Sequence, residues 1–283
     1  MPTFDTPGSI DLAIDVQVGG ITVIAGDRTD TVVTVSASVP ATDSDRRRAE
    51  ETTIDFDGKR LTIVGPRPRF SWIGPGSGDA VDITVALPNR SRLTAEIAVG
   101  NVRTAGRLGA TRVKNSTGDV ELEATGDLWL HASHGSVTVD AADGDIDITA
   151  DHGRIQVGAV ADDAILKATH GSIQVGESGG DLEAKLSYGD LEITRALASV
   201  SAKTAYGSIR LHDVSDGSIE VESGFGQVVI GVRPGVPVWL DLASKEGRVR
   251  NELSDDSAPD SSEQTVAIRA RTRYGDIDIR RSR

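Results

Sequence analysis

The chain has 283 residues, a formal net charge of −13 and no cysteine, and only 4% of its residues are aromatic. So few large side chains argue against a conventional core but suit a solenoid core of stacked Val, Ile, Leu and Ala. The acidic charge disfavours nucleic acid and anionic lipid as partners, and the lack of cysteine excludes disulfides and thiolate metal sites.

The N-terminal region, residues 1–95, is predicted to form long strands separated by irregular loops. Alternating apolar residues mark these strands at 10–14, 20–24, 31–39, 61–64 and 81–87. The charged segment 42–53 is interpreted as a connection with room for one helical turn. Because the end of a solenoid leaves backbone groups unpaired, we interpret the whole region as an antiparallel β cap that is continuous with the coils.

Phe70 and Trp72 lie in a Pro- and Gly-rich loop of this region, residues 66–78. Two aromatic residues on such a loop are candidates for an interaction tip that binds a partner. The alternative is that they fold back and cover the solenoid end. Replacing Trp72 with alanine distinguishes the two alternatives. If Trp72 covers the solenoid end, the substitution should lower the stability of the fold. If Trp72 is part of an interaction tip, the substitution should leave stability normal and abolish partner binding.

A five-residue word recurs through residues 96–250: Gly, Asp or Ser, a β-branched residue or Leu, a polar residue, and another apolar residue. Its glycines at multiples of nine residues are Gly126, Gly135, Gly144, Gly153, Gly171, Gly180, Gly189 and Gly207. Apolar residues two apart lie on one face of a strand, and glycine permits the positive φ of a tight corner. Each word therefore predicts a short strand and a corner, with Asp or Ser bonding the turn.

A second period, of about eighteen residues, distinguishes alternate words. The residue before the glycine is in turn His134, His152, His170, Tyr188, Tyr206 and Phe225. Like residues should therefore stack one coil above another, about 4.8 Å apart. The sequence predicts an all-β, parallel β-solenoid, β-helix-like, with about eighteen residues and two short strands per coil.

His134, His152 and His170 raise the question of a metal site, because histidines one coil apart could share an ion. The tyrosines and phenylalanine that continue the column cannot serve in this way, so we interpret the column as stacking. The repeated aspartates raise the same question for calcium, but the calcium-roll word Gly-Gly-x-Gly-x-Asp is missing. We expect no metal and no cofactor.

The C-terminal part, residues 251–283, is interpreted as an acidic loop followed by closing strands. Before it, residues 236–242 keep the alternation without the glycine word and predict the start of a C-terminal cap. The last fifteen residues hold six arginines, Arg269, Arg271, Arg273, Arg280, Arg281 and Arg283. We interpret them as a solvated strand pair, and the alternative is a small patch that docks an anion.

Three features of the chain resemble the bacterial putative-adhesin family of β-strand-repeat domains of unknown function. They are the strand word Gly19-Gly20-Ile21-Thr22-Val23, the strand end Val85-Ala86-Leu87-Pro88, and the serial Ser/Thr-x-Tyr/His-Gly-Asp/Ser-Ile-x-Ile words. The resemblance covers nearly the whole chain and implies a β-helix-like solenoid with no assigned catalytic residues. The family name also implies export, from which this sequence departs by showing no signal peptide.

We expect a non-catalytic scaffold or binding module that recognises a protein partner. One alternative is self-association through the rod ends, as in a filament or oligomer. A weaker alternative is a carbohydrate-active enzyme with carboxylate pairs such as Asp145 and Asp147, or Glu183 and Glu192. With no signal peptide and no apolar run of about 20 residues, we expect no membrane span and a cytoplasmic location; an extracellular location would require that a leader had been removed.

Overall fold

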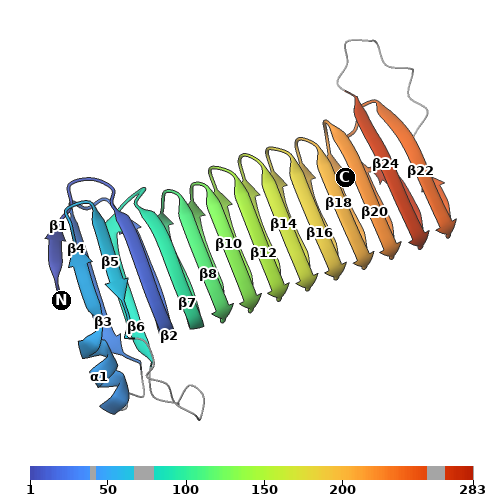
Figure 1. The fold of residues 1–283 in the computed structure, drawn as a ribbon. Coiled ribbons are helices and arrows are strands. Elements are labelled where there is room, and N and C mark those ends of the chain that lie inside the picture. Colours follow the sequence, from blue (N-terminus) through green and yellow to red (C-terminus); the bar gives the residue numbers. More distant parts are fainter. Residues whose placement is uncertain (39–42, 67–79, 254–264, 283) are drawn as a thin grey trace. The chain divides into compact units, whose positions relative to one another are not determined.

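The computed structural model describes residues 1–38, 43–66, 80–253 and 265–282. It consists of two compact units, Met1–Asp143 and Gly144–Arg283. Strands form nearly all of the regular structure, and the helix of the described residues is α1 (Asp43–Glu51), close to β3 in Figure 1.

Parallel coils of two strands form most of the first unit. Its regular strands are β8 (Thr111–Thr117), β9 (Val120–Thr125), β10 (Leu128–His134) and β11 (Val137–Ala142). β8 pairs in parallel with β10, and β9 pairs in parallel with β11. Two longer strands, β2 (Asp11–Gly26) and β7 (Arg92–Arg107), each supply both halves of a coil, since one half of β7 pairs with β8 and the other with β9.

The N-terminal end of this unit combines parallel coils with an antiparallel cap. β2 pairs in parallel with β5 (Arg60–Val64) and β6 (Val81–Pro88) on one side and with β7 on the other. Beyond that coil, β4 (Thr53–Phe56) pairs antiparallel with β5, β3 (Asp30–Ala37) with β6, and β1 (Thr3–Asp5) with β3. The antiparallel cap therefore consists of β1, β3 and β4, whereas β2, β5 and β6 already belong to coils.

The second unit contains two sets of parallel strands, here called sheet A and sheet B. Sheet A includes β12 (Ile146–His152), β14 (Ala164–His170), β16 (Leu182–Tyr188), β18 (Val200–Tyr206) and β20 (Ser218–Phe225). Sheet B includes β13 (Ile155–Val160), β15 (Ile173–Ser178), β17 (Leu191–Ala196), β19 (Ile209–Val214) and β21 (Val228–Val232). Ile146 pairs with Ala164, and Ala164 with Leu182, which confirms the predicted coil of about eighteen residues and two strands.

The last strands of the second unit do not stack in chain order. They are β22 (Val238–Glu246), β23 (Val249–Asn251), β24 (Val266–Tyr274) and β25 (Ile277–Arg281). β24 lies between β20 and β22 in sheet A, as Figure 1 shows, and β25 lies between β21 and β23 in sheet B. We call β24 and β25 the inner coil, and β22 and β23 the outer coil.

The core is a column of small and branched apolar side chains between the two sheets. In β14, for example, Ala164, Leu166 and Ala168 are buried, while Ile165 between them is exposed. The alternation predicted from the repeated word is therefore confirmed, and no large aromatic core is required.

The corners are packed so tightly that glycine is required there. Gly171 has a φ of +151°, and a Cβ built on it would lie 1.8 Å from the carbonyl oxygen of Gly153 in the preceding coil. No side chain fits in that space, and the left-handed φ is costly for residues with a Cβ. The eighteen-residue spacing of Gly135, Gly153, Gly171, Gly189 and Gly207, which all have a positive φ, is thus a direct result of stacking one corner on another.

The aspartate of the repeated word bonds to the neighbouring coil. Asp163 Oδ1 accepts a hydrogen bond from the backbone N–H of Asp181 (2.9 Å), and Asp145 Oδ1 accepts one from Asp163 (3.1 Å). The sequence predicted that the aspartate bonds the backbone of a turn, and for these residues the turn belongs to the next coil. A corner stacked directly on the previous one presents its N–H to the carboxylate below, so the aspartates tie coil to coil.

Candidate functional site

The aromatic column of the second unit is a continuous stack of parallel rings. It contains His152, His170, Tyr188, Tyr206, Phe225 and Tyr274, with neighbouring ring centroids 4.7–5.0 Å apart and planes within 7° of parallel. The inner rings have both faces covered by neighbours, which suits a stabilising role. Across the described ranges, no group of three or more His, Cys, Asp or Glu side chains is placed to hold a metal ion.

Tyr274 is a member of this column that the sequence interpretation missed. It follows Phe225 by 49 positions in the chain, because the outer coil and a connecting segment intervene, yet its ring stacks on Phe225 at 4.7 Å. The available clue was the word Tyr274-Gly275-Asp276, which has the same form as the inner repeats. Phe70 and Trp72 lie outside the described residues, so the interaction tip stays a prediction.

Three of the six C-terminal arginines are held by neighbouring groups of the chain. Arg269 contacts Asp241 at 3.2 Å and Glu220 at 3.4 Å, and Arg271 donates to Asp241 at 2.6 Å. The hydrogen bond from Arg271, followed by that from Arg269, lowers the pKa of Asp241. Arg281 donates to the backbone carbonyl oxygens of Arg233 and Val236. These three arginines therefore bind groups of their own chain.

Arg273 and Arg280 differ from them, since neither side chain makes an ion pair or hydrogen bond with the described part of the chain. Both side chains are exposed, Arg273 on β24 and Arg280 on β25. They therefore lie on different sheets, and the six arginines do not form one patch. Arg283 lies outside the described residues.

Arg280 borders a hollow of about 300 Å³ on the outer side of sheet B. The lining comprises Arg210, Leu211, His212, Gln227, Val229, Arg250, Glu252, Asp278 and Arg280. Its floor lies over β21, where the outward residues are small. Val229 pairs with Arg210 on one side and Asp278 on the other, and Gly231 pairs with Arg280. Long charged side chains on both neighbouring strands thus surround a strand that carries none.

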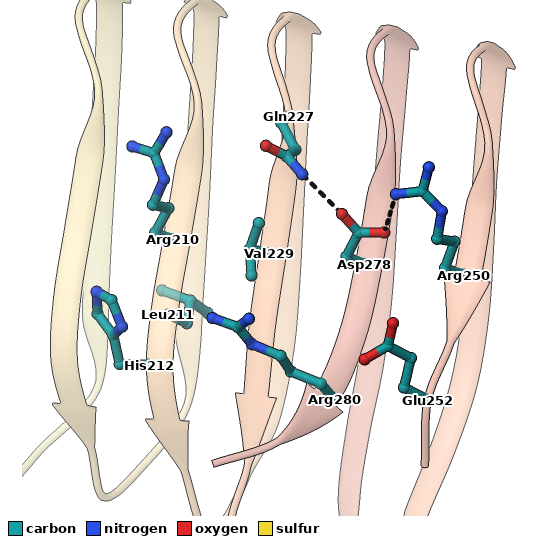
Figure 2. Close-up of a pocket in the computed structure, with 9 residues that line it drawn as sticks. All are labelled: Arg210, Leu211, His212, Gln227, Val229, Arg250, Glu252, Asp278 and Arg280. Atoms are coloured by element: carbon teal, nitrogen blue, oxygen red, sulfur yellow. Dashed lines mark hydrogen bonds and ion pairs between the residues drawn. The ribbon is translucent and has the colours of Figure 1, made fainter. Parts of the chain in front are cut away.

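The walls of the hollow are fixed by hydrogen bonds. Asp278 accepts from Gln227 Nε2 at 2.6 Å and from Arg250 Nη1 at 3.2 Å, and His212 Nε2 lies 2.7 Å from Glu192 Oε1. In Figure 2 the Arg280 side chain extends from β25 toward His212, with its guanidinium inside the ring of labelled residues. Its N–H groups are free to bind a carboxylate or phosphate oxygen in a two-pronged arrangement.

A second hollow, of about 470 Å³, adjoins the first and shares His212 and Arg280 with it. It adds Arg195, Arg233 and Arg281 to the lining, together with Asp213. Arg233 Nη2 donates to Asp213 Oδ2 at 2.5 Å, and Ser282 Oγ donates to Oδ1 at 2.9 Å. Partial burial opposes ionisation of Asp213, but these two bonds outweigh it and lower its pKa. The two hollows together form a surface in which arginine predominates.

The carboxylate pair Glu183 and Glu192, considered above for glycoside hydrolysis, does not come together. Glu183 lies on β16 of sheet A and Glu192 on β17 of sheet B, and both point outward. Lys185 hydrogen-bonds Glu183 and lowers its pKa. A glycosidase acid needs the opposite shift. The pair therefore does not support the hypothesis of a carbohydrate-active enzyme.

Comparison with family models matches residues 10–280 to Toastrack DUF4097. The chain belongs to the Toastrack family. This confirms the resemblance found in the sequence. No curated protein matches the Toastrack chain significantly.

Solved structures similar to the Toastrack chain include three bacterial proteins. A putative adhesin from Bacteroides fragilis is 12% identical with a TM-score of 0.33, and covers 98% of this chain and 95% of its own. A putative adhesin from Parabacteroides distasonis is 13% identical, with a TM-score of 0.29 and coverage of 98% and 95%. A putative cell adhesion protein from Clostridium sporogenes is 11% identical, with a TM-score of 0.24 and coverage of 99% and 98%.

Among the residues that the structure describes, no helix is long and apolar enough to span a membrane. The cytoplasmic location expected from the sequence of this Toastrack chain stays a prediction.

Proposed function

We propose that this Toastrack chain is a non-catalytic binding module that recognises an acidic segment of a protein partner through the hollow around Arg280. The observation that carries the proposal is the Arg280 guanidinium, which has no partner among the described residues, in a hollow where Gln227, Arg250, Asp278 and His212 are already hydrogen-bonded. A guanidinium with no carboxylate partner among the described residues is well suited to bind one from another chain.

The charge distribution supports an acidic partner of limited size. The whole chain carries −13, so an extended polyanion would be repelled at a distance. Within the two hollows, however, six arginines face three carboxylates, those of Asp213, Glu252 and Asp278. A short acidic segment that enters this surface gains local attraction while its remainder stays clear of the acidic faces.

The test is binding of a fluorescent glutamate-rich peptide to the purified protein, with a glutamine-rich peptide of equal length as the neutral probe. We expect Arg280→Ala to weaken binding of the acidic peptide about tenfold or more, as for loss of a charge-assisted pair. Arg273→Ala is the matched control, because the Arg273 side chain is also exposed, lies on sheet A and has no partner among the described residues.

Arg273→Ala should leave the affinity unchanged, and binding to the wild type should weaken as salt is added. Equal losses for the two variants, or equal binding of the acidic and neutral peptides, would contradict a specific site at Arg280. Both substitutions remove an exposed side chain without an internal partner, so neither is expected to impair folding.

A further inference from the structure

The outer coil has a free side along both of its strands. β22 pairs with β24 and β23 pairs with β25, and within the described ranges no other strand pairs with either of them. β22 is nine residues long, and Figure 1 shows it as the outermost strand of its sheet. A long unpaired edge is unusual in native proteins, which normally shorten, charge or cover such edges.

The hydrogen-bond pattern shows which backbone groups face this free side. Val266 N donates to Pro237 O at 3.0 Å, which places the odd-numbered residues of β22 toward the inner coil. Because neighbouring residues of a strand bond to opposite sides, Leu240 and Leu242 direct their backbone N–H and C=O groups away from it. The same reasoning applies to Val249 in β23, since Ile277 N donates to Arg248 O.

The apolar interior is also incomplete at this end. Val266, Ile268, Ala270 and Ile277 of the inner coil are all 0% exposed. Their counterparts in the outer coil are less covered: Val238, Leu240 and Leu242 are half-buried, and Val249 is 45% exposed. Both the backbone and the interior row of the outer coil therefore end where a further coil would continue them.

We propose that the outer coil pairs with the outer coil of a second copy, with β22 antiparallel to β22 and β23 antiparallel to β23 about a two-fold axis. A partner for this surface must offer two open strand edges with an apolar row between them. The outer coil of a second copy offers such a surface. In the first unit the end carries the antiparallel strands β1, β3 and β4, which do not match the parallel coil of β22 and β23. A two-fold axis pairs the outer coil with itself, so the assembly stops at two copies.

The charges of the outer coil permit this approach between two acidic chains. Asp241 is held by Arg269 and Arg271, and Arg250 is held by Asp276 and Asp278. These two charges are largely neutralised within each chain, which reduces repulsion at the proposed interface. The pairing uses the backbone edges of β22 and β23 and not Arg280, although the Arg250 side chain of β23 also lines the hollow. This inference goes beyond the proposed function and is tested separately from it.

The first experiment is sedimentation of the full chain from about 1 to 500 µM. We expect the mass to rise with concentration from 29.7 kDa to twice that value and no further. Val249→Lys should weaken dimerisation at least about tenfold, because it places a charge in the apolar row between the coils. Ile165→Lys, at an outward position on β14 that is 37% exposed, is the matched control and should dimerise normally.

Hydrogen exchange keeps the test decisive if Val249→Lys fails to fold. In the wild type, the amides of Leu240, Leu242 and Val249 should become protected as concentration rises. A mass of 29.7 kDa at every concentration overturns the proposal, and so does growth beyond two copies. Protection of these amides that does not depend on concentration would place another segment of the same chain on this edge and would also overturn it.

Discussion

The inner and outer coils of the second unit have matched positions but different surroundings. Ile268 and Leu240 face each other in register, yet Ile268 is fully buried and Leu240 is half-buried. The inner coil is covered by a neighbouring coil on both sides, whereas the outer coil is covered on one side. The difference shows that an interior side chain of a solenoid is fully buried only when its coil has a neighbouring coil on both sides. This is the expected behaviour of a one-dimensional stack of repeats.

The largest effect on the free energy of unfolding should come from shortening an interior apolar side chain, compared between the inner and the outer coil. We expect Ile268→Ala to lower the free energy of unfolding by about 3–4 kcal/mol, because it leaves a cavity between two coils. Leu240→Ala should cost about 1 kcal/mol, because that side chain is only half-buried. Urea unfolding at low protein concentration, where the chain is monomeric, measures both. Equal losses would mean that the outer coil is as well packed as the inner one.

The aromatic column offers a second comparison, with a smaller effect. Tyr206 stacks on Tyr188 at 5.0 Å and on Phe225 at 4.9 Å, whereas Tyr274 stacks on Phe225 and has Glu246 at the paired position beyond it. Each stacked pair contributes about 1 kcal/mol, so Tyr206→Ala should cost about 2 kcal/mol and Tyr274→Ala about half as much.

Thermal unfolding followed by circular dichroism provides that measurement. Replacing each tyrosine with phenylalanine is the control, since the ring is kept and little change is expected. If Tyr274→Ala were the more harmful substitution, the ring stack would not explain the stability of the column.

The smallest effect concerns the connection that leads to the outer coil. Asp213 holds Arg233 in that connection, and its pKa is lowered. Because the ionised form is the stabilising one, its contribution is complete above the ordinary pKa of 3.8 and is lost as pH falls through the lower value in the folded state. Asp213→Asn should therefore cost about 1 kcal/mol at about pH 7 and less in acid.

Urea unfolding at several pH values tests this. Glu177→Gln provides the comparison, since the Glu177–Arg195 pair is exposed and should contribute less than about 0.5 kcal/mol. A loss for Asp213→Asn that stayed constant into acid would show that the charge of Asp213 is not the cause.

The coil was predictable because the sequence repeats its physical requirements. Glycine at each corner and apolar residues two apart in each strand are local features, so the period of eighteen could be read from the chain. The order of coils at the C-terminal end could not. Two stretches of similar pattern, Val238–Glu246 and Val266–Tyr274, compete for the place next to β20, and only their packing determines which one takes it.

The candidate site was less predictable than the fold. The cluster of C-terminal arginines was visible, but the sequence did not show that Asp241 holds two of them. Nor did the sequence show that the small residues Val229 and Gly231 of β21 form the floor of the hollow beside Arg280. This depends on the register between β19, β21 and β25. Such a hollow results from neighbouring columns of side chains, and single repeats do not reveal it.

The reversed order of the last two coils has a consequence for biosynthesis. β22 and β23 emerge from the ribosome before β24 and β25, but it is with these later strands that they pair. Until then the edge of β20 and β21 is open, and the early-made coil can occupy it in a non-native register. The final folding step should therefore be an insertion that depends on contacts remote in sequence, and such steps are slow and prone to kinetic trapping.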